Sequence, residues 1–330
     1  MLEHGGRLRN AAAQYGIALE HWLDLSTGIN PLPWCGPPVP RLAWARLPES
    51  DDGLLQAAQQ YYGAPSVLPV AGSQSAIMHL PRLRASSRVA VVEPSYAEHA
   101  LRWREAGHAV SSITIEQCAA AAESADVLIL VNPNNPTGSR INRMQLLRWH
   151  ERLAARGGWL LIDEAFADPD PTDSVASFTD RDGLIVLRSF GKFFGLAGAR
   201  VGFVLGTPSL LSALDAQLGP WPLAGPARFI ARRALTDHRW HLAMRTQLQA
   251  LAQRLKGLLQ RHGLTPAGGC SLFQWVPTSH ATAVHDALAR QGILTRLFRT
   301  PQSLRFGLPA EELHWQRLEF ALTAHQRDCA

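Results

Sequence analysis

Five short apolar runs between residues 88 and 206 are the strongest constraint on the fold of this chain. Each run holds β-branched or Leu residues and is bounded by turn residues, as is typical of strands buried on both faces of a sheet. The runs are RVAVVEP (88–94), DVLILVNP (126–133), GWLLIDEA (158–165), GLIVLRSF (183–190) and RVGFVLG (200–206). Helical patterns separate them, for example at 142–156, where Asn142 is suited to be the N-cap. This alternation predicts an α/β fold with a mainly parallel central sheet flanked by helices.

The length of the chain allows more than one domain. Its 330 residues are 46% hydrophobic and 18% charged, which is enough to bury a large core. Proline-rich stretches at 31–40 and 219–226 are typical of hinges. We therefore expect a large ligand-binding domain over 41–225. The N-terminal arm, 1–40, and the C-terminal segment, 226–330, are expected to form a smaller α+β domain together.

Composition also bears on where the protein works. The longest apolar runs are far shorter than the roughly 20 residues needed to cross a bilayer, and the start of the chain lacks the apolar core of a secretory signal. The cysteines are widely spaced and match no disulfide or metal-ligand pattern, so we expect free thiols and no metal site. They are Cys35, Cys118, Cys270 and Cys329. We expect a cytoplasmic protein that does not enter a membrane.

The net charge of +5 raises the question of nucleic-acid binding. The densest basic stretch, 228–261, holds eight Lys and Arg residues, but its pattern is that of one long amphipathic helix. No zinc-finger or aromatic-interleaved pattern accompanies it, so a solvated helix face explains the charge better and we expect no nucleic-acid partner. A surplus of Arg equally suits a small anionic ligand such as a phosphate or a carboxylate.

Polar residues follow the predicted strands at the point where each strand ends. Asn132 and Asn135 follow VLILV, Asp163 follows WLLI, and Ser189 and Lys192 follow LIVLR. Parallel α/β sheets bind ligands beyond the carboxyl ends of their strands. The sequence therefore predicts a ligand site at this edge of the sheet.

Lys192 stands out because only two of the 32 Lys and Arg residues are lysines. A lysine amine can lose its proton and attack a carbonyl to form a Schiff base, whereas an arginine stays protonated. Phe193 and Phe194 give Lys192 an apolar setting. The aldehyde that proteins most often hold in this way is pyridoxal phosphate, and we expect it as the cofactor.

Other residues could supply the remaining contacts of that cofactor. Asp163 could keep the pyridine nitrogen protonated, although a lone Asp after a strand can also cap a helix. The turn GSQSA (72–76) contributes Ser73 and Gln74, whose amides would face a phosphate at the start of a helix. Tyr96 could stack on the ring, with a packing role as the alternative.

Three motifs resemble those of the class I/II aminotransferases, the fold-type-I pyridoxal-phosphate enzymes. They are NPNNPTG (132–138), DEAF (163–166) and SFGKFFGLAGARVGF (189–203), in this order and spacing. The resemblance implies that Lys192 is the Schiff-base lysine, that Asp163 pairs with the pyridinium nitrogen and that Asn135 donates to the ring hydroxyl. It further implies a phosphate site made by the residues Ser73, Gln74, Ser189 and Arg200.

The resemblance extends to the end of the chain. SLRFGLP (303–309) is similar to the late family motif whose arginine, here Arg305, binds the substrate carboxylate. GILTRLF (292–298) resembles the segment before that motif, which implies that Arg296 is a second anion ligand; a surface charge is the alternative. Family members are usually homodimers, and Tyr61 matches a position that reaches the phosphate in the other subunit. One departure is Phe166, because the family usually has Tyr there, so a phenol donor to the ring hydroxyl is missing.

The start of the chain indicates a reaction. LEHGGRLRNAAAQYG with WLDLSTGINPLPW is similar to the opening of the threonine-phosphate decarboxylases of cobalamin biosynthesis. That resemblance implies that L-threonine O-3-phosphate is decarboxylated to (R)-1-amino-2-propanol O-2-phosphate. The residues implied for binding the substrate phosphate are His4, Gly5, Gly6, Asn30 and Arg296. A histidinol-phosphate-like or other aminotransferase remains the alternative, followed by a binding protein without turnover, since sequence alone does not fix the substrate orientation.

Overall fold

The computed structural model describes residues 4–329 and divides the chain into two compact units. The larger unit comprises 33–135 and 139–243, and the smaller comprises the N-terminal residues up to 32, residues 136–138, and the chain from 244 onward. The second boundary therefore falls inside a helix rather than in the proline-rich stretch at 219–226. The predicted division into a domain over 41–225 and a smaller domain made of 1–40 and 226–330 stays a prediction.

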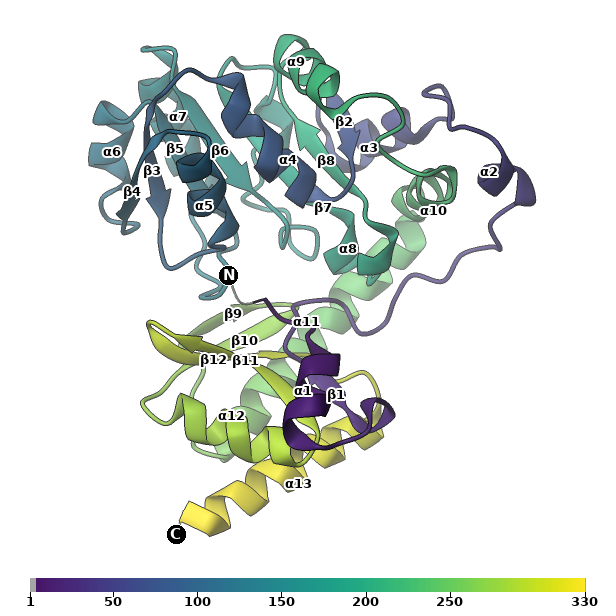
Figure 1. The fold of residues 1–330 in the computed structure, drawn as a ribbon, viewed down its shortest axis with the longest axis vertical. Coiled ribbons are helices and arrows are strands. Elements are labelled where there is room, and N and C mark those ends of the chain that lie inside the picture. Colours follow the sequence, from purple (N-terminus) through teal and green to yellow (C-terminus); the bar gives the residue numbers. More distant parts are fainter. Residues whose placement is uncertain (1–3, 330) are drawn as a thin grey trace. The chain divides into compact units, whose positions relative to one another are not determined.

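The larger unit is built on a seven-stranded sheet with the order β2-β8-β7-β6-β5-β3-β4 (Figure 1). Its strands are β2 (Val67–Val70), β3 (Arg88–Val92), β4 (Ala109–Ile113), β5 (Val127–Val131), β6 (Trp159–Asp163), β7 (Leu184–Ser189) and β8 (Gly202–Leu205). All five predicted strands are present. The five strands from β4 to β7 along the sheet run parallel, whereas β8 is antiparallel to both β7 and β2. The prediction of a mainly parallel sheet is confirmed.

Helices complete the larger unit, and the strands read as apolar runs because both faces of the sheet are covered. The helices are α2 (Arg41–Ala45), α3 (Leu54–Tyr62), α4 (Ser73–His79), α5 (Glu98–Glu105), α6 (Cys118–Ser124), α7 (Arg143–Ala154), α8 (Phe190–Phe193), α9 (Pro208–Leu218) and α10 (Gly225–Leu235). One face packs Ile77 of α4, Trp103 of α5 and Leu214 of α9 against strand residues such as Ile129 and Leu187. On α7, the side chain of Asn142 accepts a hydrogen bond from the backbone of Gln145 at 2.9 Å, as predicted for an N-cap.

The smaller unit holds a five-stranded sheet with the order β1-β11-β12-β10-β9. Its elements are α1 (Leu8–Tyr15), β1 (Leu23–Leu25), most of α11 (His238–Arg261), β9 (Gly268–Cys270), β10 (Phe273–Pro277), α12 (Ala281–Arg290), β11 (Ile293–Arg299), β12 (Gln302–Gly307) and α13 (Glu312–Cys329). β1 pairs in parallel with β11, with Leu23 opposite Ile293. The two ends of the sequence therefore share one sheet, as expected for an α+β unit made from both.

The basic stretch 228–261 is not one helix, which corrects the prediction. α10 ends at Leu235, and α11 (His238–Arg261) begins after Asp237. The carboxylate of Asp237 accepts hydrogen bonds from the backbone of Trp240 at 3.1 Å and from the indole nitrogen of Trp34 at 3.0 Å. Asp237 therefore caps the start of α11, and a capping residue lies outside the helix, so α10 has to end before it. The contact with Trp34, distant in sequence, was not accessible to a periodicity argument.

Within residues 4–329, no helix has the length and apolar character needed to cross a membrane.

Candidate active site

The carboxyl edge of the large sheet gathers the polar residues predicted there. Asp163 is the last residue of β6 and Ser189 the last of β7, while Asn132 directly follows β5. Because these three strands are parallel and adjacent, their carboxyl ends meet at the same edge. Lys192 lies just beyond β7 in α8.

Asp163 is held by two donors. Its side chain is buried, with 3% of the residue exposed. One carboxylate oxygen lies 2.9 Å from Nε2 of His99, and the other accepts from the backbone of Ala165 at 3.0 Å. No helix begins directly after Asp163, so the helix-cap alternative is wrong. The carboxylate is fixed in orientation, as a partner for a protonated ring nitrogen would need to be.

Tyr96 and Gln74 form one hydrogen-bonded group with two charged residues of α5. The hydroxyl of Tyr96 donates to Oε1 of Gln74 at 3.0 Å, and Nε2 of Gln74 donates to Glu98 at 2.8 Å. Glu98 is also bound by Arg102 at 2.9 Å. Since the side-chain amide of Gln74 is engaged in this way, its backbone amide is the group left for the predicted phosphate contact.

The pKa of Tyr96 is influenced by charged residues predicted to bind the ring nitrogen and the phosphate of the cofactor. Burial raises the pKa of Tyr96 to about 12, and the carboxylates of Glu98 and Asp163 act in the same direction. Arg200 and Arg102 oppose them. Tyr96 is therefore a neutral phenol at pH 7, and the charges of Asp163 and Arg200 shift its pKa in opposite directions.

The predicted phosphate site is a place of close backbone approach. A Cβ atom at Gly72 would lie 2.8 Å from Nη2 of Arg200, and one at Gly202 would lie 2.4 Å from the backbone nitrogen of Ser73. Arg200 itself has a φ of 54°, a left-handed conformation that is unusual outside glycine. The start of α4, the guanidinium of Arg200 and the first residue of β8 therefore meet without room for further side chains.

Lys192 lies in aromatic surroundings. Its Nζ is 5.7 Å from the ring centre of Phe166, and the neighbouring Phe190, Phe193 and Phe194 are fully buried. The aromatic rings hold the short helix α8 in place, with Phe190 stacked on Phe194 at 4.4 Å between ring centres. Lys192 is thus the amine of the site, held on a short helix whose position is fixed by aromatic packing.

These features fit pyridoxal phosphate. The donor set offers an amine, a buried carboxylate, a neutral tyrosine ring and an arginine beside glycine-lined backbone. Asn135, the first residue of the NPTG segment (135–138) that follows β5, is half-buried in the same unit. All of the residues proposed for the cofactor thus belong to the larger unit.

The residues proposed for the substrate all belong to the smaller unit. Arg305 and Arg296 lie opposite one another on β12 and β11. Arg305 is 6% exposed; burial, together with the charge of Arg296, lowers its pKa to about 10, while Cys270 and Asp24 act in the opposite direction. A buried guanidinium beside a second, half-buried one favours an anionic ligand.

Ser26 joins the glycine pair to Arg305. Its hydroxyl accepts from the backbone of Gly6 at 2.7 Å and donates to Asp24 at 2.6 Å, while its carbonyl accepts from Nη2 of Arg305 at 2.9 Å. A Cβ atom at Gly5 would come within 2.4 Å of the same carbonyl oxygen. Glycine is therefore required at position 5 for close packing.

His4 and Asn30 are less specifically placed. His4 is half-buried in the smaller unit. Asn30 is 2% exposed, and its Oδ1 accepts from the backbone of Leu32 at 2.9 Å. Their contacts with a substrate phosphate stay a prediction.

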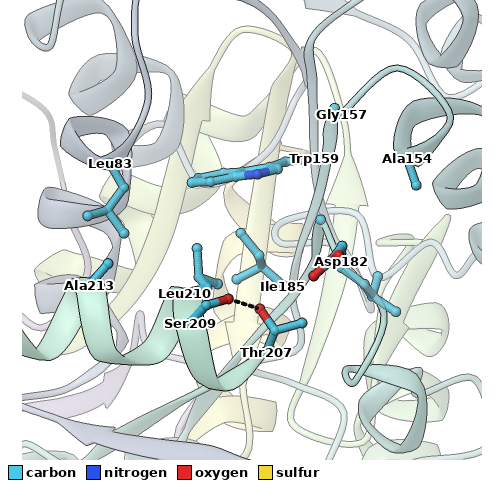
Figure 2. Close-up of a pocket in the computed structure, with 13 residues that line it drawn as sticks. Leu83, Ala154, Gly157, Trp159, Asp182, Ile185, Thr207, Ser209, Leu210 and Ala213 are labelled. Carbon is cyan, nitrogen blue, oxygen red and sulfur yellow. Dashed lines mark hydrogen bonds between the residues drawn. The ribbon is translucent and has the colours of Figure 1, made fainter.

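A pocket of about 380 Å³ lies at the opposite edge of the large sheet. Figure 2 shows the Trp159 ring over Ile185 and Leu210, with Asp182 to one side and a 3.2 Å hydrogen bond between Thr207 and Ser209. Trp159 is the first residue of β6, whereas Asp163 is its last. This pocket is therefore separate from the predicted site.

The family model for class I and II aminotransferases matches residues 44–318. The chain belongs to this family. The resemblance inferred from the three motifs is confirmed, and it covers both the Asp163 region and the Arg305 region.

Two curated relatives are similar over almost their whole length. The threonine-phosphate decarboxylase of Pseudomonas aeruginosa is 58% identical over 322 residues, which cover 98% of this chain and 97% of the relative. The threonine-phosphate decarboxylase of a Sinorhizobium species is 43% identical, with 97% of both chains covered.

A solved structure agrees with the fold. The histidinol-phosphate aminotransferase from Sinorhizobium meliloti, in complex with pyridoxal-5'-phosphate, has a TM-score of 0.84 and 22% identity over 100% of this chain and 96% of that chain. At this identity the likeness establishes the fold alone. The predicted α/β fold-type-I architecture, with a mainly parallel sheet and a smaller α+β part from both chain ends, is confirmed.

Tyr61, the residue predicted to reach a second subunit, packs among other aromatic rings. Its ring packs against Tyr62 at 4.9 Å, His241 at 4.7 Å and Phe194 at 5.6 Å between ring centres. These contacts place Tyr61 in the aromatic cluster of its own chain. A reach to the phosphate in a second subunit stays a prediction.

Sequence reasoning missed the residues that hold the predicted ones. His99 and Glu98 lie within three residues of Tyr96, and their helical spacing on α5 was the available signal. Ser26 lies in the DLSTGIN segment, but its role in connecting Gly6 to Arg305 was not predicted, because these partners are distant in sequence.

Proposed function

We propose that this protein is a pyridoxal-phosphate-dependent threonine-phosphate decarboxylase of cobalamin biosynthesis. The observation that carries the proposal is the 58% identity to the Pseudomonas aeruginosa threonine-phosphate decarboxylase over 98% of this chain. The donor set at the carboxyl edge of the sheet supports it. A histidinol-phosphate-like or other aminotransferase remains the competing activity, because the family contains both.

The cofactor residues take distinct roles in this proposal. Pyridoxal phosphate supplies an aldehyde for an amine and a ring that withdraws electrons from a bond at the substrate Cα. Lys192 would bind the aldehyde, and Asp163, oriented by His99, would keep the ring nitrogen protonated. Asn135 would donate to the ring hydroxyl and Tyr96 would cover the ring face. Ser73, the backbone of Gln74, Ser189 and Arg200 would bind the phosphate.

The substrate residues decide which bond at Cα breaks. In a decarboxylase the substrate residues would position the bond to the carboxylate for cleavage, and in a transaminase they would position the bond to the Cα hydrogen. Arg305 is assigned to the carboxylate, with a planar fork suited to two hydrogen bonds. His4, Gly5, Gly6, Asn30 and Arg296 are assigned to the substrate phosphate, so that binding energy distant from Cα fixes the torsion. Lys192 or a water would supply the proton that replaces the lost carboxylate at Cα.

The protein is proposed to act as a cytoplasmic homodimer with no nucleic-acid or membrane partner. Exposed apolar side chains support the dimer: Leu42, Trp44 and Leu47, in and after α2, are 68%, 70% and 64% exposed. Clustered exposed apolar side chains are typical of protein interfaces. Tyr61 is assigned to the second subunit's phosphate site within this dimer.

One assay separates the two activities. Purified protein is incubated with pyridoxal phosphate and L-threonine O-3-phosphate, without any oxo-acid. Release of carbon dioxide and 1-amino-2-propanol O-2-phosphate is the expected result. Turnover that requires 2-oxoglutarate would establish the aminotransferase instead, and a yellow protein without turnover in either mixture would indicate a binding protein.

A further inference from the structure

A buried ion cluster lies directly behind the proposed cofactor site. Arg188 of β7 forms ion pairs with Glu164 and Asp168, and these side chains are 3%, 0% and 1% exposed. The ring of Tyr62 covers the guanidinium, with 4.6 Å between the Arg188 Cζ and the ring centre. Burial alone would lower the pKa of Arg188, but Asp168 and Glu164 outweigh it and raise the pKa, so the guanidinium stays charged.

Stability does not account for such a cluster. Removing charges from water costs free energy that their attraction only partly recovers, and well-packed apolar residues often replace buried ion pairs without loss of stability. The cluster also sets two carboxylates against one guanidinium. The position of the cluster therefore says more about its role than its contribution to the stability of the fold does.

The geometry connects the two residues that must meet the same cofactor. Glu164 directly follows Asp163, and Arg188 directly precedes Ser189 and lies four residues before Lys192. Side chains alternate along a strand, so Glu164 and Arg188 point away from the face that carries Asp163 and Ser189. The backbone nitrogen of Glu164 donates to Leu187 at 2.9 Å, which fixes the register of β6 and β7 at this point.

Arg188 holds the first part of the loop after β6 at two points, Glu164 and Asp168. Glu164 is the first contact, and its carboxylate also accepts from the hydroxyl of Ser174 at 2.6 Å and the backbone of Val175 at 3.0 Å. Asp168 is the second contact. Between the two lies Phe166, whose ring faces Lys192.

We propose that Arg188, clamped between Glu164 and Asp168, is a positioning residue that fixes the spacing between the Asp163 carboxylate and the Lys192 amine. This proposal rests on the proposed function, because it assumes that both groups address one cofactor ring. Arg188 touches neither cofactor nor substrate. It acts by locking the β6 loop to β7 on the rear of the sheet.

The low lysine content makes the test direct. Pyridoxal phosphate is added to cofactor-free protein, the lysine adduct is reduced with borohydride, and peptide mass spectrometry separates Lys192 from Lys256, the two lysines of the chain. The half-saturating cofactor concentration for labelling at Lys192 is one readout. The pH midpoint of the visible absorbance of the lysine-bound cofactor is the second, and a purely structural role would not move it.

Asp168→Ala removes one arm of the clamp and leaves a neutral Arg188–Glu164 pair, whereas Asp168→Asn keeps an oxygen acceptor. We expect Asp168→Ala to raise the half-saturating concentration at least about tenfold and to shift the pH midpoint, because Arg188 would then hold the loop after β6 at Glu164 alone and the Asp163–Lys192 spacing would no longer be fixed. Asp168→Asn should stay within about twofold of the unaltered protein. Arg140→Met, which removes the exposed pair with Asp170 in the same region, is the matched control and should change neither readout.

The proposal is overturned if Asp168→Ala is labelled and titrates like the unaltered protein. Should Asp168→Ala fail to fold, the neutral combination Arg188→Met, Glu164→Gln and Asp168→Asn takes its place. That variant is expected to fold and to show the same two changes; unfolding of this variant would assign the cluster to stability and also reject the clamp. Failure of the proposed function has a different signature, because the unaltered protein would then release no carbon dioxide or take up no cofactor at Lys192.

Discussion

At the scale of single residues, the chemistry depends on which side chains hold the reactive ones. Asp163 is oriented by His99 and by the backbone of Ala165. The Nζ of Lys192 lies 5.7 Å from the ring centre of Phe166. The carboxylate of the site is thus oriented by hydrogen bonds, and the amine faces an aromatic ring.

Replacement of Lys192 tests the central assignment. We expect Lys192→Ala to lose the visible absorbance of the lysine-bound cofactor and to lower kcat by at least about a thousandfold, because no other amine can take the covalent role. Lys256→Ala, on the exposed face of α11, is the control and should keep both. Unchanged absorbance in Lys192→Ala would assign the cofactor bond elsewhere.

The site was predictable where one residue carries its own chemical signature. Lys192, Asp163 and Arg200 were identified from type, position after a strand, and motif. The residues that position them were not predictable, because the partners of His99, Arg188 and Ser26 come close only in the folded chain. A single sequence contains no signal for a contact between positions 26 and 305.

At the scale of elements, the approach of β8 to the start of α4 sets the shape of the proposed phosphate site. Gly202 is the first residue of β8 and pairs with Val70, the last residue of β2. α4 begins only three residues after Val70. The antiparallel pairing therefore brings Arg200 back to the same turn.

Gly202→Ala should push this turn open. Its Cβ would lie 2.4 Å from the Ser73 nitrogen, so the backbone must shift, at a cost of about 1–3 kcal/mol. We expect a lower melting temperature and a cofactor dissociation constant raised about tenfold or more, measured by absorbance titration. Gly198→Ala, where nothing lies within 4 Å of the added atom, is the matched control. Equal cofactor affinity in both variants would remove this turn from the phosphate site.

A second element-scale prediction concerns pH. Burial would raise the pKa of Asp52, but hydrogen bonds from Arg228 of α10 and from the backbone of Leu54 outweigh it and lower the pKa. A carboxyl with a lowered pKa stabilises the fold above its unfolded pKa of about 4 and loses that contribution as pH falls through the folded value. Asp52→Asn should therefore be less stable than the unaltered protein at pH 7, by about 1 kcal/mol.

That stability gap should close as the pH falls below about 4. Urea unfolding at a series of pH values measures it. Asp215→Asn, on the exposed side of α9, serves as the control and should show no such trend. A gap that stays constant down to acid pH would mean that the Asp52–Arg228 pair does not contribute through its charge.

Elements that form from local patterns were predictable, and those decided by distant contacts were not. The central strands β5, β6 and β7 are continuous apolar runs, and Asn142 marks the start of α7 by its own side chain. The break between α10 and α11 depends on Asp237 meeting Trp34, some 200 residues away in sequence. The pairing of β1 with β11 likewise has no local cue.

At the scale of the whole molecule, the segment around α2 exposes an apolar surface of the kind that protein interfaces cover. Trp44 is 70% exposed although tryptophan is strongly apolar, and Leu42 and Leu47 flank it. In the proposed dimer this segment meets the second copy, since burying aromatic side chains contributes most to such interfaces.

Trp44→Glu should weaken self-association. A carboxylate in the middle of an apolar contact costs desolvation free energy, so we expect the dimer dissociation constant to rise at least about tenfold, measured by sedimentation velocity over a concentration series. Phe320→Glu, on α13 and 72% exposed, is the control and should leave the mass distribution unchanged. If the Trp44→Glu protein sediments like the unaltered one, the α2 segment is not the interface.

The pairing of β1 with β11 sets an order of events during synthesis. Residues 23–25 leave the ribosome early, but the strand beside which they lie is translated only at 293–299. The larger sheet has all of its strands by residue 205 and can assemble while translation continues. Ribosomes that stop early would thus release chains able to make the lysine-bearing half but without the sheet that carries Arg296 and Arg305.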